Sequence, residues 1–251
     1  MKVFFVGAGP GDPELLTCKA HRLLASCKIC VYAGSLVSPQ VIGMIAPTAE
    51  KHDSAVLDLD QIMAIFTHAK QRDMDVVRLH TGDPSIFGAI GEQMALLKKL
   101  DIQYEVIPGV SSFQAAAAAL SVELTAPEIS QTIILTRTAG RTPVPQTQKL
   151  DALAKAQATL CIFLSVHDLA AITVTLSGHY GNDCPAAVVC HASWPDQQIV
   201  RGTLSDIAGK ASDAHMDKTA MILVGRALGA VGTVSKLYDA AFTHGYRQGR
   251  E

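Results

Sequence analysis

Three glycine-containing turns are the parts of this sequence whose residue types and spacing best suit chemistry. The first is VGAGPGDPELLT, residues 6–17, where Gly7, Gly9 and Gly11 surround a proline at the end of a predicted strand. Glycine allows backbone conformations that other residues avoid and lets a ligand approach the chain closely. The turn therefore predicts a ligand site at the carboxyl end of a strand. A tight strand–helix turn without a ligand is the alternative that this motif alone leaves open.

The first turn lacks the pattern of a dinucleotide-binding site. That pattern, G-x-G-x-x-G, needs glycine at position 12, where this chain has Asp12 followed by Pro13. An aspartate before a proline is typical of a helix N-cap, so its carboxylate would occupy the place of a pyrophosphate. The second predicted strand ends in YAG, residues 32–34, and offers no acid to bind a ribose. The sequence therefore argues against a nicotinamide-dependent dehydrogenase.

Two later turns have the same arrangement. RLHTGDPSIFG, residues 78–88, places Asp83 and Pro84 after a predicted strand, and VIPGVSSFQAAAAAL, residues 106–120, places Ser111 and Ser112 before an alanine-rich helix. Asp83 either holds a polar or cationic ligand or caps the helix after it, and the serines either cap their helix or contact a ligand. Three such turns at the carboxyl ends of three strands predict one ligand crevice in an open α/β sheet.

These motifs carry a resemblance to a known family. GAGPGDPELLT, TGDPSIFG and IPGVSSFQAA, in this order and spacing, resemble the S-adenosylmethionine-dependent tetrapyrrole methylases of corrin and sirohaem synthesis, over residues 1 to about 228. Four further runs are similar to the members that methylate a corrin precursor at C-11: YAGSLV, PEISQTIILTRTAGRTPVP, ASWPDQQIVRGTL and SKLYDAAFTHGYR. The resemblance implies S-adenosylmethionine as methyl donor, a tetrapyrrole as substrate, and a homodimer.

The resemblance also implies which residues contact the donor. They belong to the three turns and to three positions of the second half: Pro10, Thr81, Gly82, Asp83, Ile86, Ser111, Ser112, Leu164, Ala192 and Ala220. Relatives that methylate uroporphyrinogen often carry Met at the position of Leu164, and Asn-Gly-Thr where this chain has His-Ala-Ser around Ala192. These departures argue against a uroporphyrinogen substrate but leave donor binding intact, because both positions contribute shape or backbone groups.

Methyl transfer from a sulfonium to an electron-rich ring carbon requires alignment and exclusion of water more than a strong acid or base. The sequence therefore assigns no catalytic base. Asp83 is a weak candidate, and Glu105, Glu123 and Glu128 are candidates only because they fall near the predicted crevice.

The implied substrate carries many carboxylates, which arginine side chains bind well. Arg137 and Arg141, in the loop after a predicted strand, are the first choices for substrate binding. The alternative is that both are solvated loop charges. Trp194, followed by Pro195, is interpreted as a packing residue at a hairpin.

Strand-like and helical patterns alternate in the first half of the chain. Predicted strands at 2–6, 28–32, 75–80 and 103–107 alternate with predicted helices at 14–24, 59–70, 89–100 and 112–120. Such alternation predicts a largely parallel α/β sheet. After a pause at 123–130, further strands are predicted at 132–136, 159–164, 186–191, 198–202 and 219–224. The third and fourth of these are about six residues apart, which predicts that they form a hairpin.

The fold class expected from pattern and resemblance together is a two-domain α/β fold of the tetrapyrrole-methylase type. It has a mainly parallel N-terminal sheet, a mixed C-terminal sheet and the active-site cleft between them. The expected domains are 1–122 and 123–228, followed by a C-terminal tail at 229–251.

Composition excludes several other classes of function. A net charge of −2 argues against nucleic acid as the main partner. No apolar run approaches the roughly 18 residues of a membrane span, and Gly, Pro and Asp interrupt the apolar start before it could serve as a signal peptide. The six cysteines mostly lie in apolar runs, which predicts buried free thiols and a cytoplasmic protein. The nine histidines lack metal-binding spacings, so no protein-bound metal is expected.

Other functions remain open from the sequence. Within the same fold they are a methylase of another ring carbon and, less favoured without a basic surface, a diphthine synthase or a ribosomal RNA ribose methylase. From a different class, the chain could be a non-catalytic S-adenosylmethionine-binding sensor, although it carries no appended effector domain. The sequence leaves open whether the ring already contains cobalt.

Overall fold

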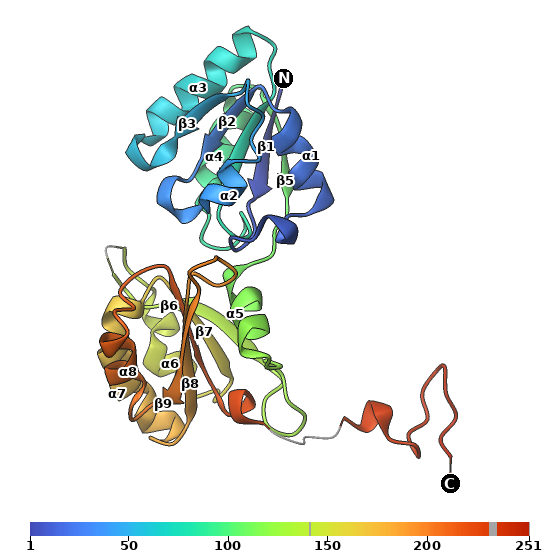
Figure 1. Ribbon diagram of the computed structural model, residues 1–251, viewed down its shortest axis with the longest axis vertical. Coiled ribbons are helices and arrows are strands. Elements are labelled where there is room, and N and C mark those ends of the chain that lie inside the picture. The colour runs from blue at the N-terminus through green and yellow to red at the C-terminus, as the bar shows by residue number, and fades with distance from the viewer. Residues whose placement is uncertain (141, 231–234, 251) are drawn as a thin grey trace. The chain divides into compact units, whose positions relative to one another are not determined.

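The protein forms two α/β units in a computed structural model that describes residues 1–140, 142–230 and 235–250 (Figure 1). The first unit contains residues 1–116 and 191–197, and the second contains 117–190 and 198–251. The first unit thus takes in a seven-residue segment from a distant part of the chain. The domain boundaries expected after residues 122 and 228 stay predictions.

A five-stranded sheet forms the centre of the first unit. Its strands are β1 (Lys2–Gly7), β2 (Ile29–Tyr32), β3 (Glu50–Asp53), β4 (Val76–His80) and β5 (Gln103–Ile107). They lie in the order β3-β2-β4-β1-β5, and every pair is parallel. The parallel N-terminal sheet expected from the sequence is therefore confirmed. Parallel strands bring the loops that follow β1, β4 and β5 to the same edge of the sheet.

Helices cover both faces of this sheet. They are α1 (Cys18–Ser26), α2 (Pro39–Ile42), α3 (Leu59–Gln71) and α4 (Ile90–Lys99), while α5 (Ser112–Leu120) contains the division between the units. On one face Phe5 packs in a cluster with Phe66 of α3 and Leu97 of α4. On the other face Val6 packs with Leu24 of α1 and residues of α2. Burial of both faces makes this sheet a rigid base for its loops.

Two local features of the first unit differ from the sequence prediction. The helix predicted at 14–24 is divided into a short 3₁₀ helix, η1 (Pro13–Leu15), and α1, because Thr17 accepts a hydrogen bond from the Ala20 N–H and starts a new helix. Asp12 caps η1 by accepting from the Glu14 N–H, which confirms the expected N-cap. Strand β3 was not predicted, because its sequence, EKHD, is entirely polar and it lies at the edge of the sheet.

The second unit has a mixed sheet, as the sequence predicts. Its strands are β6 (Ile133–Arg137), β7 (Thr159–Phe163), β8 (Pro185–Cys190), β9 (Gln198–Thr203) and β10 (Ala220–Val224). In the order β6-β7-β10-β8-β9, only β6 and β7 are parallel. Strands β8 and β9 form the expected hairpin, with Pro185 opposite Thr203.

The described part of the second unit also contains the helices α6 (Leu150–Ala154), α7 (Leu169–Tyr180) and α8 (Ile207–Asp213). The core joins Ile162 and Ile222 of the sheet to Leu176 of α7 and Ile207 of α8. None of the helices in the described part of the chain is long and apolar enough to cross a membrane.

Candidate functional site

The loops after β1 and β4 are joined through their backbones. The Gly9 N–H donates to the Gly82 oxygen at 3.3 Å, and the Gly82 N–H donates back to the Gly9 oxygen at 2.8 Å. Next to this pair, the Ala8 N–H donates to the oxygen of His80 at 2.7 Å. Gly9 and Gly82 have φ angles of 67° and 58°, which glycine adopts without strain.

The loop after β5 lies against the same two loops. A Cβ atom on Gly109 would overlap the carbonyl oxygen of Gly82, and one on Gly7 would lie 2.6 Å from that oxygen and 2.7 Å from the Gly109 Cα. No side chain fits between three backbones at this separation. The three glycine turns predicted from the sequence therefore meet at one edge of the first sheet.

Asp83 links two of these loops through its carboxylate. Oδ1 accepts hydrogen bonds from the Ser85 N–H, at 2.8 Å, and from the Ser85 hydroxyl, while Oδ2 accepts from the Gly109 N–H at 3.0 Å. Partial burial acts to raise the pKa of Asp83, but the hydrogen bonds from Ser85 and Gly109 outweigh it and hold the pKa below its usual value. Helix α4 begins only at Ile90, so Asp83 does not cap the following helix.

Other residues of the first unit that are predicted to contact the methyl donor lie in the same three loops. The Ile86 N–H donates to the Asp83 oxygen at 3.2 Å, which closes the turn after Asp83. Ser111 is buried, and its N–H donates to Gln114 Oε1 at 2.9 Å, just before α5 begins at Ser112. Thr81 is exposed beside Gly82.

The charged side chains of the three glycine loops are all acidic. Residues 7–12, 81–89 and 108–112 contain two carboxylates, those of Asp12 and Asp83, and no lysine, arginine or histidine. Such loops suit a ligand that carries positive charge and do not suit a pyrophosphate, which needs positive charge or free helix N–H groups.

Residues 191–197, which connect β8 to β9, also contact the first loop. The Trp194 Nε1–H donates to the Pro10 oxygen at 2.7 Å, and the Asp12 N–H donates to Ser193 Oγ at 3.0 Å. Ala192, a predicted donor contact, lies in this segment and is buried. The sequence alone does not predict the Trp194 contact, although a lone tryptophan in a hairpin is a signal that could have drawn attention to it.

Below the loops, β4 carries two buried basic side chains. Arg78 donates from Nε to Gln93 Oε1 and from Nη1 to the Val31 oxygen, each at 3.3 Å, and burial lowers its pKa to about 10. His80 is 4% exposed, and its Nε2 atom has no hydrogen-bond partner among the residues that the structure describes. Burial, together with the nearby charge of Arg78, lowers the pKa of His80 to about 3. His80 is therefore neutral at physiological pH.

This buried histidine should make folding sensitive to acid. In the unfolded chain His80 binds a proton at the usual pKa of about 6.5, whereas in the folded protein it stays neutral down to about pH 3. The contribution of His80 to the free energy of unfolding is therefore complete above about pH 6.5 and is lost as the pH falls below that value. The loss approaches about 1.4 kcal/mol per pH unit. His80→Phe should flatten the pH dependence of the unfolding free energy, measured by urea unfolding between pH 7 and 4.5. Replacing the exposed His21 by Phe is the control, and equal slopes in all three proteins would contradict the expectation.

The predicted site residues of the second unit lie at one edge of its sheet. Leu164 follows β7, Arg137 ends β6, and Ala220 begins the antiparallel β10 opposite the end of β7. Leu164 is 63% exposed and has a φ of 55°, which a leucine rarely adopts. Ser165 fixes this turn, because its buried hydroxyl donates to the Phe163 oxygen at 2.6 Å and accepts from the Thr138 N–H at 2.8 Å.

Arg137 organises its own loop. Nη1 donates to the oxygens of Thr138 and Thr142, at 3.2 and 3.1 Å, and Nη2 donates to the Pro143 oxygen at 3.0 Å. The second predicted arginine, Arg141, lies outside the described residues.

The glutamates named as candidate bases have other contacts. Glu105 forms ion pairs with Lys2, at 3.1 Å, and with Lys19, and these partners lower its pKa, Lys19 more than Lys2. Glu123 accepts a hydrogen bond from Thr125 Oγ1 at 3.1 Å. Glu128 lies in a tight turn with a φ of 64°.

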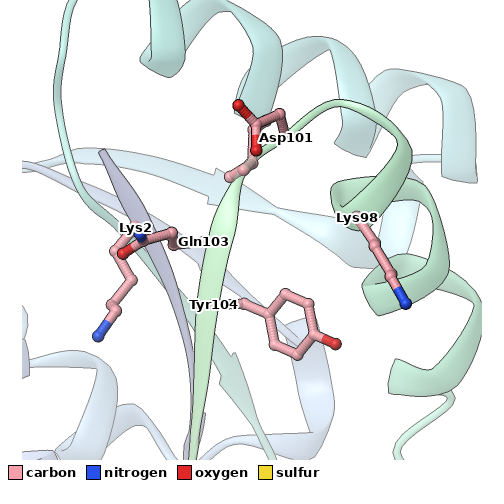
Figure 2. A pocket seen from close by; sticks show the side chains of 6 residues that line it. Lys2, Lys98, Asp101, Gln103 and Tyr104 are labelled. Atoms are coloured by element: carbon pink, nitrogen blue, oxygen red, sulfur yellow. The ribbon is translucent and has the colours of Figure 1, made fainter.

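A separate hollow lies away from these loops. It measures about 350 Å³ and is lined by Lys2, Lys98, Asp101, Ile102, Gln103 and Tyr104 (Figure 2). Lys2 begins β1 and Gln103 begins β5, so the hollow lies at the amino ends of these strands, opposite the glycine loops. Among the described residues, no three acidic, histidine or cysteine side chains are grouped to hold a metal ion.

Fold and loop motifs together define a class of protein. Residues 2–208 match the family model of the tetrapyrrole (corrin/porphyrin) methylases, and this chain belongs to that family. The protein is therefore a methyltransferase.

Particular relatives are also similar over their full lengths. A precorrin-4 C(11)-methyltransferase of Pseudomonas aeruginosa is 50% identical over 250 residues, which cover 99% of this chain and 100% of the relative. The crystal structure of a cobalamin biosynthetic enzyme, cobalt precorrin-4 methyltransferase, matches with a TM-score of 0.88 and 43% identity, over 90% of this chain and 95% of that one. A Thermus thermophilus uroporphyrin-III C-methyltransferase in complex with S-adenosylhomocysteine matches with a TM-score of 0.76 and 28% identity, over 91% of this chain and 99% of that one.

Proposed function

We propose that this protein transfers a methyl group from S-adenosylmethionine to C-11 of precorrin-4, or of its cobalt complex, in cobalamin biosynthesis. Support comes from the family membership and from the names of relatives that match 90% or more of the chain. The residues that depart from the uroporphyrinogen enzymes, Leu164 and the segment around Ala192, favour a corrin precursor over a uroporphyrinogen.

The observation that carries the donor assignment is the charge of the glycine loops. They contain two carboxylates and no basic residue, and the histidine beneath them is neutral. S-adenosylmethionine supplies a methyl group on a positively charged sulfur, which such loops can accommodate without competing cations. We propose that the donor contacts are those expected from the sequence: Pro10, Thr81, Gly82, Asp83, Ile86, Ser111, Ser112, Leu164, Ala192 and Ala220.

In this proposal the protein contributes mainly by alignment. Methyl transfer is an in-line displacement, and holding the reacting atoms in position can supply most of the catalytic effect. The reciprocal hydrogen bonds between Gly9 and Gly82 and the Asp83–Gly109 bond fix the loops before a ligand arrives. Loops that are already ordered lose less conformational entropy on binding.

For the substrate, we propose that Arg137 and Arg141 bind carboxylates of the tetrapyrrole. Three hydrogen bonds to its own loop hold the Arg137 guanidinium in place, which lowers the entropic cost of placing its remaining donors on a carboxylate. We also propose that the enzyme works as a homodimer in the cytoplasm. The cytoplasmic setting is supported by the six cysteines, which mostly lie in apolar runs of the sequence.

Anaerobic incubation with precorrin-4 and S-adenosylmethionine tests this function. We expect a product heavier by one methyl group, located at C-11 by NMR with an isotopically labelled donor. Calorimetry should detect binding of S-adenosylhomocysteine and none of NAD, which serves as the control for a different adenine-containing ligand. Parallel assays with cobalt-precorrin-4 decide which ring is used. Methylation at another ring carbon, or tight binding of NAD alone, would refute the proposal.

A further inference from the structure

The single tryptophan of the chain occupies an unusual position against the first glycine loop. Trp194 donates its indole N–H to the Pro10 carbonyl oxygen at 2.7 Å. The edge of the same indole lies against Gly11, where a Cβ atom would overlap Cδ1 and Nε1. One residue earlier, Ser193 accepts a hydrogen bond from the Asp12 N–H at 3.0 Å. Residues 193 and 194 therefore contact three successive residues of the loop.

The segment that carries Trp194 is itself held firmly. The His191 ring stacks on the indole with centroids 4.7 Å apart and an angle of 16° between the planes, and its Nδ1 atom lies 2.8 Å from Asp196 Oδ2. His191 and Ser193 have φ angles of 48° and 70°, which cost energy for residues other than glycine. The Ser193 N–H donates to Gln197 Oε1 at 2.8 Å. Such strain persists only where surrounding contacts impose it, as they do here.

The two hydrogen bonds from this segment end on backbone atoms of the loop. The Pro10 carbonyl is an acceptor whose partner comes from residues far along the chain, and Pro10 precedes the positive-φ residue Gly11. Without Trp194 and Ser193, the Pro10 carbonyl and the Asp12 N–H would lose these fixed partners and could reorient. A loop that must be ordered during binding lowers affinity, because the entropic cost falls on the binding step.

We propose that Trp194 is a positioning residue for methyl-donor binding. Its indole fixes the Pro10–Asp12 turn in the form that receives the donor, and the stack of His191, held by Asp196, fixes the indole. The proposal rests on the assignment of S-adenosylmethionine as donor. It adds that the affinity for the methyl donor depends on Trp194, whose indole packs against Gly11.

Because Trp194 is the only tryptophan, its fluorescence reports on this contact directly. The wild-type protein is titrated with S-adenosylhomocysteine while indole emission is recorded, and calorimetry gives the affinity independently. We expect a saturable change in emission whose midpoint equals the calorimetric dissociation constant. Calorimetric binding without any change in emission would overturn the proposal while leaving donor binding intact, whereas absence of binding by both methods would refute the proposed function as well.

The variant Trp194→Phe then removes the indole N–H and keeps an aromatic ring. Loss of this hydrogen bond should weaken S-adenosylhomocysteine binding by about three- to tenfold and raise the KM for the donor similarly, with the KM for the tetrapyrrole unchanged. Tyr104→Phe, which removes a hydroxyl from the edge strand at the hollow in Figure 2, is the matched control and should change neither value. A lower melting temperature with wild-type donor affinity would make Trp194 only a structural residue and overturn the proposal.

Discussion

Replacement of Gly109 by alanine should lower the free energy of unfolding by about 3 kcal/mol and abolish measurable binding of the methyl donor. The added Cβ atom would overlap the Gly82 carbonyl oxygen and lie 2.9 Å from the Gly7 Cα. Both neighbours are backbone atoms held by the parallel sheet, so neither can move away as a flexible side chain would. The three loops would have to separate, which also breaks the hydrogen bond from the Gly109 N–H to Asp83.

Urea unfolding and calorimetry with S-adenosylhomocysteine measure the two effects. The matched control is Gly178→Ala in α7, where a Cβ atom would meet none of the described atoms within 4 Å. That change should stabilise the protein by about 0.5–1 kcal/mol, because alanine favours the helix. A Gly109→Ala variant as stable as the wild type would mean that the loops do not touch as described.

Asp83→Asn should weaken donor binding by about tenfold or more and cost about 2 kcal/mol of stability. Asparagine keeps one oxygen but replaces the other with an NH₂ group. Both carboxylate oxygens of Asp83 accept hydrogen bonds, from Ser85 and from Gly109, so the NH₂ group must face an N–H donor. Either Ser85 or Gly109 then loses its hydrogen bond to residue 83. This result differs from a simple helix cap, where asparagine replaces aspartate almost without cost.

Thermal melts with and without donor measure both consequences. Asp58→Asn provides the control, because Asp58 is a helix cap whose Oδ1 atom accepts from the Gln61 N–H at 2.8 Å in a capping box. The folded protein holds the pKa of Asp83 below its usual value. Its contribution to the free energy of unfolding should therefore be complete above the usual pKa and be lost as the pH falls through the lowered pKa of the folded state. An unchanged melting temperature and donor-induced shift in Asp83→Asn would exclude Asp83 from both roles.

The sequence predicts the parallel sheet well because its signals are local. β-branched runs and amphipathic stretches alternate, and each glycine turn follows its strand directly. Strand β3 cannot be predicted in this way, because its sequence, EKHD, has no apolar pattern. It forms an edge strand because it pairs with β2. Likewise, a capping residue such as Thr17 can divide a predicted helix without changing the hydrophobic pattern.

The candidate site was harder to predict in detail than the fold. The motifs identify Asp83, but its two partners come from residues 85 and 109, and only the parallel register brings Gly109 near it. Trp194 is still further from prediction, because its partner Pro10 is 184 residues away. Side chains whose role depends on such distant contacts leave no periodic pattern in the sequence.

The seven residues that join β8 to β9 limit where the protein can be divided into fragments that fold and function. They group with the first unit, although the strands on both sides of them belong to the second. A fragment ending at residue 116 would contain all three glycine motifs yet lack the tryptophan and serine that contact the first of them. The two halves are therefore not interchangeable modules, and chimaeras that exchange the second half between relatives would transplant part of the first unit with it.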